Sequence, residues 1–225
     1  MEPDNPLLDD YILAQADADA GDLPVVCFVG TASGDSADYI VKFYSAFNQR
    51  PCRPRHLSLF RQAGDLSKFV LECDVIYVGG GNTRNAIAIW KAAGLDVLLR
   101  EAWENGTILC GISAGAICWF EQGLTDSEGA LTAMDCLGFV PGSCTPHYDG
   151  EPERKPAYRK SVADGTLAPG YAIDDSAALH FVDDEEPVVV SSVWSANAYA
   201  VTKTDAGAAE ELLKTRFLGA QRAEN

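Results

Sequence analysis

Three short apolar runs most constrain the fold of this 225-residue chain. They cover residues 24–30, 74–79 and 107–111, and each is apolar at consecutive positions and ends in glycine. Continuous rather than alternating apolar residues indicate strands that are covered on both faces, as in a parallel sheet. Helical patterns at 36–49 and 83–93 follow the first two runs. This alternation predicts an α/β fold: a mostly parallel central sheet flanked by helices.

The rest of the chain extends this pattern at both ends. Further helices are expected at 7–16, 65–72, 95–104 and 208–217, and a strand at 55–60. Beyond residue 130 the apolar runs become shorter, which predicts additional antiparallel strands or hairpins at 137–140, 171–173, 177–181, 188–192 and 198–202. With neither a repeat nor a clear linker, we expect an acidic leader at 1–22 and a single α/β domain at 23–225.

Charge and composition exclude several classes of partner. A net charge of −16 argues against binding to nucleic acid or to an anionic membrane, because both are polyanions. No basic segment precedes an apolar run at the start of the chain, and no stretch approaches the roughly 18 apolar residues that span a bilayer. The seven cysteines are scattered and several lie in apolar runs, which favours free thiols in the cytoplasm. The sequence leaves open whether the protein is a monomer or a homodimer.

The segment Gly111-Ile112-Ser113-Ala114-Gly115 lies at the junction between the third apolar run and an expected helix beginning at Ala116–Phe120. A Gly-x-Ser-x-Gly at a strand-to-helix turn exposes the serine hydroxyl, as in a nucleophile elbow. The alternative is a tight corner with a small polar residue. Two other small-residue loops, 31–34 and 79–82, also follow apolar runs, so ligand-binding loops are expected to converge at one edge of the sheet.

A serine nucleophile requires a general base, and the chain has three histidines. His56 lies in a basic stretch and is expected at the surface. His180 lies in an apolar strand, where a hydrogen-bonded core histidine is the better interpretation. His147 lies in a polar, turn-rich segment soon after a strand. Elimination therefore favours His147 as the base.

The acid that would orient this base is less well specified. Asp126 is preferred, and Glu121, Glu128 and Asp149 are alternatives; each of the four could instead cap a helix or be a solvated charge. Glu121 is expected in the helix after Ser113, roughly 12 Å along it at about 1.5 Å per residue, which is a long reach for this role.

Backbone amides and arginines complete the expected site. The N–H of Ala114 and one from Gly80 or Gly81 would form an oxyanion hole, since glycine lets the backbone approach a reacting carbonyl. Arginines in an acidic chain could hold a substrate carboxylate, although pairing with Glu151 or Glu153 at the surface is at least as good an interpretation. The expected substrate-binding residues are Asn82, Thr83, Arg154 and Arg159. Neither the cysteines nor the histidines have metal-ligand spacing, and no metal or other cofactor is expected.

Five motifs in order resemble the peptidase E family. They are Gly79-Gly80-Gly81-Asn82, Gly111-Ile112-Ser113-Ala114-Gly115, Cys118-Trp119-Phe120-Glu121, Thr125-Asp126-Ser127 and Pro146-His147-Tyr148-Asp149-Gly150-Glu151. The resemblance covers about residues 24–205. It implies a class I glutamine-amidotransferase-like α/β fold and cytoplasmic cleavage of dipeptides with an N-terminal aspartate, without metal or organic cofactor.

The same resemblance assigns roles to residues of this chain. It implies that Ser113 is the nucleophile, His147 the base, Gly79–Gly81 the loop with an oxyanion donor, and Arg154 the residue that holds the aspartyl side chain. Counting without gaps from the serine puts the acid of the enteric type on Glu128, so this chain departs from the pattern there.

The motifs around Phe120 and Asp126 instead resemble a Gram-positive branch of the family. Two alternative functions stay open. One is a cyanophycinase-like or other serine amidase or esterase, and the other is a non-catalytic small-molecule-binding protein.

Overall fold

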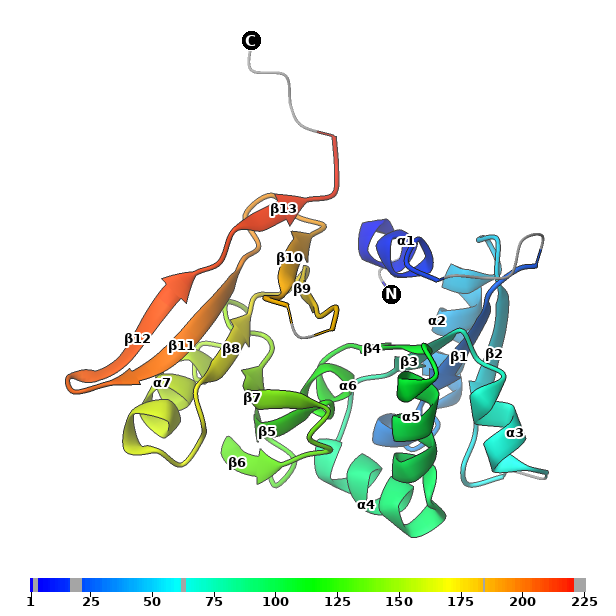
Figure 1. Ribbon diagram of the computed structural model, residues 1–225, viewed down its shortest axis with the longest axis horizontal. Coiled ribbons are helices and arrows are strands. Elements are labelled where there is room, and N and C mark those ends of the chain that lie inside the picture. Colours follow the sequence, from blue (N-terminus) through cyan, green and yellow to red (C-terminus); the bar gives the residue numbers. More distant parts are fainter. Residues whose placement is uncertain (2–3, 17–21, 62–63, 184, 221–225) are drawn as a thin grey trace.

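A four-stranded parallel sheet forms the first half of the molecule, in the strand order β2-β1-β3-β4 (Figure 1). The computed structural model describes residues 1, 4–16, 22–61, 64–183 and 185–220. The strands are β1 (Val25–Val29), β2 (Arg53–Leu57), β3 (Val75–Val78) and β4 (Ile108–Gly111). All of their pairings are parallel.

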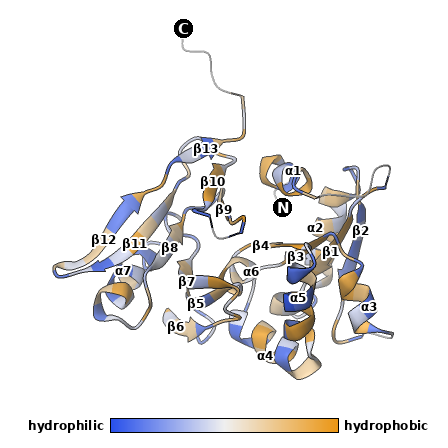
Figure 2. Ribbon diagram, viewed as in Figure 1, coloured by the Kyte–Doolittle hydropathy of each residue, from blue (hydrophilic) through white to orange (hydrophobic). Residues whose placement is uncertain are grey.

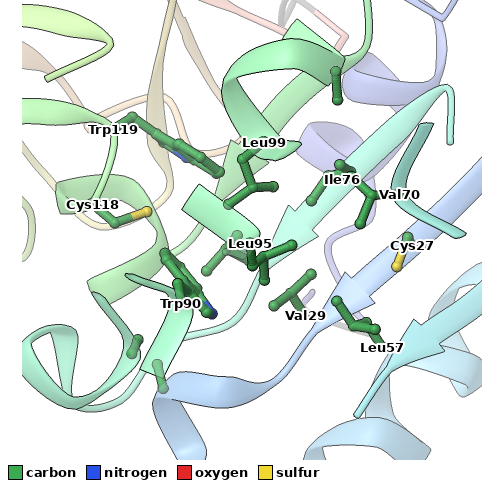
Figure 3. Packing of buried hydrophobic residues seen from close by; sticks show 14 of the residues in the cluster. Cys27, Val29, Leu57, Val70, Ile76, Trp90, Leu95, Leu99, Cys118 and Trp119 are labelled. Atoms are coloured by element: carbon green, nitrogen blue, oxygen red, sulfur yellow. The ribbon is translucent and has the colours of Figure 1, made fainter. Parts of the chain in front are cut away.

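The residues of β1 and β3 are divided between two apolar layers. Cys27, Val29, Ile76 and Val78 pack on one face of the sheet against α3 (Leu66–Leu71), α4 (Thr83–Ala93) and α5 (Leu95–Glu104). Figure 3 shows this layer, with the buried Trp90, Leu95 and Leu99 over the strands. Intervening residues such as Phe28 and Tyr77 pack on the opposite face against α1 (Leu7–Leu13) and α2 (Ala37–Phe47). This division accounts for the continuous apolar runs.

The second half contains two further sheets. A six-stranded mixed sheet has the order β12-β11-β8-β7-β5-β6, and a three-stranded sheet has the order β13-β10-β9. Figure 2 contrasts the hydrophobic β10 with the hydrophilic edge strand β2. The elements are β5 (Phe120–Thr125), β6 (Thr132–Asp135), β7 (Val140–Thr145), α7 (Arg154–Asp164), β8 (Gly170–Ile173), β9 (Ala177–His180), β10 (Val188–Ser191), β11 (Ala198–Thr204), β12 (Gly207–Leu212) and β13 (Thr215–Phe217).

The α/β class, the parallel central sheet and the additional antiparallel strands are confirmed, but two expected helices are wrong. The helix after Ser113, α6 (Ala114–Ile117), is a single turn, and the chain continues as β5. The expected helix at 208–217 is instead β12 and β13, seen in red at the end of the chain in Figure 1. Residues 207–212 pair antiparallel with β11, so tertiary pairing overrides the helix propensity of their alanines, glutamates and leucine.

The prediction also missed three elements and misplaced one. Helix α7, strand β6 and the 3₁₀ helix η1 (Thr31–Ser33) were not expected, and the strand expected at 137–140 lies later in the chain, as β7. None of the helices in the described ranges is long and apolar enough to cross a membrane. All seven cysteines are free thiols.

The segment 5–13, which contains α1, connects the two halves. Asn5 donates hydrogen bonds to the backbone and side-chain oxygens of Ser192, and the Tyr11 hydroxyl lies 2.9 Å from Nδ1 of His180. The expected leader thus contains an ordered helix, although residues 17–21 of it lie outside the described residues. The boundary of a single domain at 23–225 stays a prediction.

Candidate active site

Ser113 occupies a strained turn between β4 and α6. Its backbone has φ 56° and ψ −115°, a conformation that non-glycine residues rarely adopt. The flanking glycines are needed because backbone packs directly on them. A Cβ on Gly115 would lie 2.2 Å from the carbonyl oxygen of Val78, and one on Gly111 would lie 2.3 Å from that of Gly115. These contacts fix the elbow against β3 at the carboxyl end of the sheet.

His147 reaches Ser113 from the second sheet. It follows the carboxyl end of β7, and its Nε2 lies 3.0 Å from Ser113 Oγ. Its backbone also has a positive φ, 56°, and its carbonyl oxygen accepts the N–H of Glu151 at 3.0 Å. The pairing expected from the sequence is therefore present in the geometry.

The acid beside His147 is Asp175, which was not among the residues considered from the sequence. Its Oδ1 lies 2.6 Å from His147 Nδ1. Asp175 follows the carboxyl end of β8, and β8 pairs in parallel with β7, so the two loops emerge at one sheet edge. The signal was available: Asp174 and Asp175 come directly after the strand predicted at 171–173. What the sequence did not give was that β7 and β8 are neighbours.

Local contacts hold the Asp175 loop in place. The Asp175 N–H donates to Oδ1 of Asp149 at 2.8 Å, and Asp174 exchanges hydrogen bonds with the backbone of Asn197. Gly150 leaves space for the carboxylate, because a Cβ there would lie 2.3 Å from Asp175 Oδ2. Ser113, His147 and Ser176 are three of the five described non-glycine residues with positive φ, so backbone strain is concentrated here.

The acids favoured from the sequence lie elsewhere. Asp126 has its Oδ1 3.8 Å from Nη2 of Arg154, and Glu128 pairs with Arg84 at 3.3 Å. Glu121 lies on β5, where its carboxylate accepts the N–H of Gly142. The structure brings none of the three to His147, since the chain leaves the elbow as a strand rather than as the expected helix. Asp149 contacts the backbone of Asp175 instead of the imidazole.

The glycine loop after β3 lies against Ser113. A Cβ on Gly80 would be 3.2 Å from Cβ of Ser113, so a side chain there would crowd the nucleophile. The N–H of Gly80 donates to the hydroxyl of Tyr39 at 3.0 Å, and burial raises the pKa of Tyr39. Gly81, at φ 136°, packs against the backbone of Ala32. In the ranges that the structure describes, no hydrogen-bond acceptor is found for the N–H of Ala114 or of Gly81.

Asn82 and Thr83, expected to bind substrate, have structural partners. Oδ1 of Asn82 caps α4 by accepting the N–H of Asn85, and its Nδ2 donates to the carbonyl oxygen of Ser127. Thr83 is buried, with its hydroxyl 3.4 Å from that of Thr125. These contacts join the glycine loop to the end of β5.

The two arginines proposed to bind a carboxylate differ in burial and in their partners. The Arg154 side chain is only 3% exposed; its Nε donates to Glu151 at 2.6 Å and its Nη1 to the carbonyl oxygen of Leu124 at 3.1 Å. Arg159 is 47% exposed and contacts Glu210 and the backbone of Ala208 on β12. The structure does not bring Arg159 close to Arg154 and its partners, because the two arginines are five residues apart on α7 and their side chains lie on different faces of the helix.

The other histidines have partners of their own. His56 Nδ1 lies 3.0 Å from the hydroxyl of Tyr44, and His180 Nδ1 is paired with Tyr11. Burial lowers the pKa of His180, and the charge of Arg216 adds to this effect. Over the described part of the chain, no group of three or more His, Cys, Asp or Glu side chains could hold a metal ion.

Comparison with known proteins identifies the family. The description "Peptidase family S51" matches residues 1–189. The chain is 54% identical over 220 residues to the uncharacterized peptidase YgaJ of Bacillus subtilis, covering 97% of this chain and 94% of that protein. It is 27% identical over 133 residues to peptidase E of Pasteurella multocida, covering 55% of this chain and 57% of that protein.

Two solved structures share the fold. A peptidase from an acI-B1 actinobacterium superposes with a TM-score of 0.71 at 17% identity, covering 93% of this chain and 89% of that one. A candidate peptidase E protein of Listeria monocytogenes superposes with a TM-score of 0.59 at 24% identity, covering 80% and 91%. The family match over residues 1–189 and the 54% identity to YgaJ establish that the chain belongs to peptidase family S51.

Proposed function

We propose that this peptidase is a cytoplasmic serine-type exopeptidase that hydrolyses dipeptides with an N-terminal aspartate. The observation that carries the proposal is the chain of hydrogen bonds from Asp175 through His147 to Ser113, with distances of 2.6 and 3.0 Å. A nucleophile, a base and an orienting acid at such distances form the arrangement used in acyl transfer. The free cysteines favour a reducing compartment.

The proposed mechanism gives a defined role to each of the three catalytic groups. Ser113 Oγ bonds to the scissile carbonyl carbon while its proton passes to His147 Nε2 and the carbonyl π electrons move onto the oxygen. Collapse of this intermediate breaks the C–N bond, and His147 gives the proton to the leaving amine. Water then attacks the acyl-enzyme by the same steps, which releases aspartate and restores Ser113. Asp175 holds the imidazole and stabilises its protonated form.

Arg154 is the proposed reader of the aspartyl carboxylate. A protein of net charge −16 repels anions in general, so an anionic substrate needs a fixed cation at the site. The guanidinium of Arg154 is buried and pre-oriented by Glu151 and Leu124. Its third contact, to the exposed Asp126 at 3.8 Å, is the weakest, so a substrate carboxylate would displace that one.

The proposal is tested by the hydrolysis of aspartyl para-nitroanilide against its alanyl, glutamyl and asparaginyl analogues. We expect selective turnover of the aspartyl compound by the native protein and none by Ser113→Ala, with unchanged circular dichroism. Activity retained in Ser113→Ala would refute the assignment of Ser113 as the nucleophile. Equal turnover of all four analogues would refute the specificity, and turnover only of an aspartyl polymer would point to a cyanophycinase-like enzyme.

A further inference from the structure

We propose that the hydroxyl of Tyr39 is a catalytic hydrogen-bond donor in the oxyanion hole, acting together with the N–H of Ala114. The inference rests on the proposed function, because it assigns a donor for the intermediate formed at Ser113. It adds a side chain from α2 to a site otherwise built from the loops after β3, β4, β7 and β8.

The position of Tyr39 follows from contacts around Gly80. The N–H of Gly80 donates to the Tyr39 hydroxyl at 3.0 Å. The point where a Cβ of Gly80 would stand lies 3.2 Å from Cβ of Ser113 and 3.7 Å from the hydroxyl oxygen of Tyr39. The phenol and the proposed nucleophile therefore border the same small space, which only a glycine leaves open.

This hydrogen bond changes which group is available to the substrate. The single proton of the Gly80 amide is directed at Tyr39, so that amide does not face a reacting carbonyl in this arrangement. The phenol oxygen accepts the hydrogen bond from this amide, and its own O–H stays available as a donor. Among the described residues this O–H has no acceptor, and accepting a hydrogen bond makes a hydroxyl a stronger donor. The Tyr39 O–H, polarised by the Gly80 amide, is therefore the donor that this loop offers to a substrate oxygen.

The phenol is held un-ionised and in place. Burial raises the pKa of Tyr39, so the group keeps its proton at neutral and mildly alkaline pH. Its ring packs on Phe28 with centroids 5.0 Å apart. Gly79 makes room for both rings, because a Cβ there would lie 2.8 Å from Phe28 Cζ and 3.1 Å from Tyr39 Cε1. A donor that is rigid before the substrate arrives needs no reorganisation during the reaction.

Each of the three glycines of the loop then meets a different steric requirement. Gly79 accommodates the Phe28 and Tyr39 rings, Gly80 leaves the space between the phenol and Ser113, and Gly81 packs on the backbone of Ala32. In the proposed step, Ser113 Oγ bonds to the carbonyl carbon, its proton goes to His147, and the new oxyanion accepts hydrogen bonds from Tyr39 and Ala114. No proton leaves Tyr39, so nothing further is required to balance the step.

The test compares Tyr39→Phe with Tyr44→Phe. Tyr44 is a matched control on the same helix, with its hydroxyl bonded to His56 and its ring packed on Phe43. Removing one oxyanion donor costs about 10²- to 10³-fold in kcat. We expect that loss in Tyr39→Phe on aspartyl para-nitroanilide, with KM within about threefold of the native value. Tyr44→Phe is expected to keep kcat within about twofold.

A second readout separates catalysis from structure. The aminoboronic acid analogue of aspartate forms a tetrahedral adduct with a serine, whereas L-aspartate is a ground-state product. Tyr39→Phe is expected to lose affinity for the boronic acid by the same factor as kcat and to bind L-aspartate unchanged. Rates are referred to the folded fraction from circular dichroism, so a variant that folds poorly is still informative. A parallel loss of affinity for both ligands would indicate a structural role and overturn the inference.

The outcomes also separate this inference from the proposed function. Activity that depends on Ser113 but is unchanged or increased in Tyr39→Phe would overturn the role of Tyr39 alone, and an increase would mean that the hydroxyl only blocks the Gly80 amide. Activity that survives Ser113→Ala would overturn both.

Discussion

Replacing Asp175 by asparagine is the sharpest test of the geometry, because the structure and the sequence patterns point to different acids. Asparagine keeps the size of the side chain and can still accept the Nδ1–H of His147 through its amide oxygen. The variant therefore removes mainly the negative charge that stabilises the protonated imidazole. We expect kcat to fall while KM changes little, since Asp175 contacts the base and not Arg154.

The size of the loss follows from the exposure of the pair. Two unit charges about 4 Å apart interact by about 4 kcal/mol at an effective dielectric constant of 20 and about 1 kcal/mol in water. The side chain of Asp175 is 53% exposed and that of His147 is 24% exposed, so the site lies between these limits. A value of about 2 to 3 kcal/mol corresponds to a decrease of about 30- to 150-fold in kcat.

The assay is steady-state hydrolysis of aspartyl para-nitroanilide, with Glu128→Gln as the matched control. Glu128 is the position that ungapped counting favours, and its exposed pair with Arg84 should contribute little, so we expect its kcat within about twofold of native. The reasoning would be refuted by a native rate in Asp175→Asn. It would equally be refuted by a loss in Glu128→Gln as large as that in Asp175→Asn.

Four further predictions follow from the same contacts. The unfolding free energy of Ser113→Gly in denaturant melts should exceed that of Ser113→Ala by about 1 kcal/mol, because glycine adopts the positive φ of this position without strain. Gly115→Ala should lower the unfolding free energy by about 3 kcal/mol in thermal or denaturant melts, because its Cβ meets a backbone oxygen at 2.2 Å. Arg154→Met should lower kcat/KM for the aspartyl substrate about 10- to 150-fold relative to the alanyl analogue, matching the loss of one charged hydrogen-bonded contact. Burial lowers the pKa of His180, so the unfolded chain takes up that proton first; stability should fall as pH drops below about 6.5 toward the lowered value, and His180→Gln should flatten this dependence in pH-resolved melts.

The first half of the fold could be predicted because its signals are local. Helices α4 and α5 have the bounds expected from the sequence, at 83–93 and 95–104, since apolar spacing and the glycines around them specify where they start and stop. Strands β1, β3 and β4 of the first sheet are continuous apolar runs because α1 and α2 cover one face and α3 to α5 cover the other.

The second half was harder because pairing partners decide its structure. Residues 116–120 are apolar and short, a pattern that fits either a helix or a strand, and their continuation in β5 depends on pairing with β6 and β7. Helix α7 carries mainly polar residues and buries only a few, such as Tyr158 and Val162, so its apolar periodicity is weak. Residues 208–212 are good helix formers, but they pair with β11 as part of strand β12.

The residues of the candidate site likewise divide into those with local sequence signals and those placed by tertiary contacts. Ser113 and the glycine loop have local signatures, and His147 was the remaining histidine in a polar turn. Asp175 directly follows a predicted strand, but this position alone does not identify it as the partner of His147, because that role depends on β8 lying beside β7. Tyr39 was not expected either, since it lies on a helix that looks like an ordinary amphipathic element and reaches the site only through the bare backbone of Gly79 and Gly80.

The arrangement of the sheets determines which distance in the site is most sensitive. His147 and Asp175 both follow strands of the six-stranded sheet, and these two strands are hydrogen-bonded neighbours, so direct backbone pairing holds the two loops side by side. Ser113 follows β4 of the other sheet, and α6 packs across the junction against β3, β4, β5 and β7. A Cβ on Gly123 of β5 would lie 2.1 Å from Cγ2 of Ile117, so β5 packs closely on this helix. A small shift between the sheets would therefore lengthen the bond from Ser113 to His147 while leaving the bond from His147 to Asp175 intact. Substitutions at this junction should thus lower the rate of acylation without removing the orientation of the base.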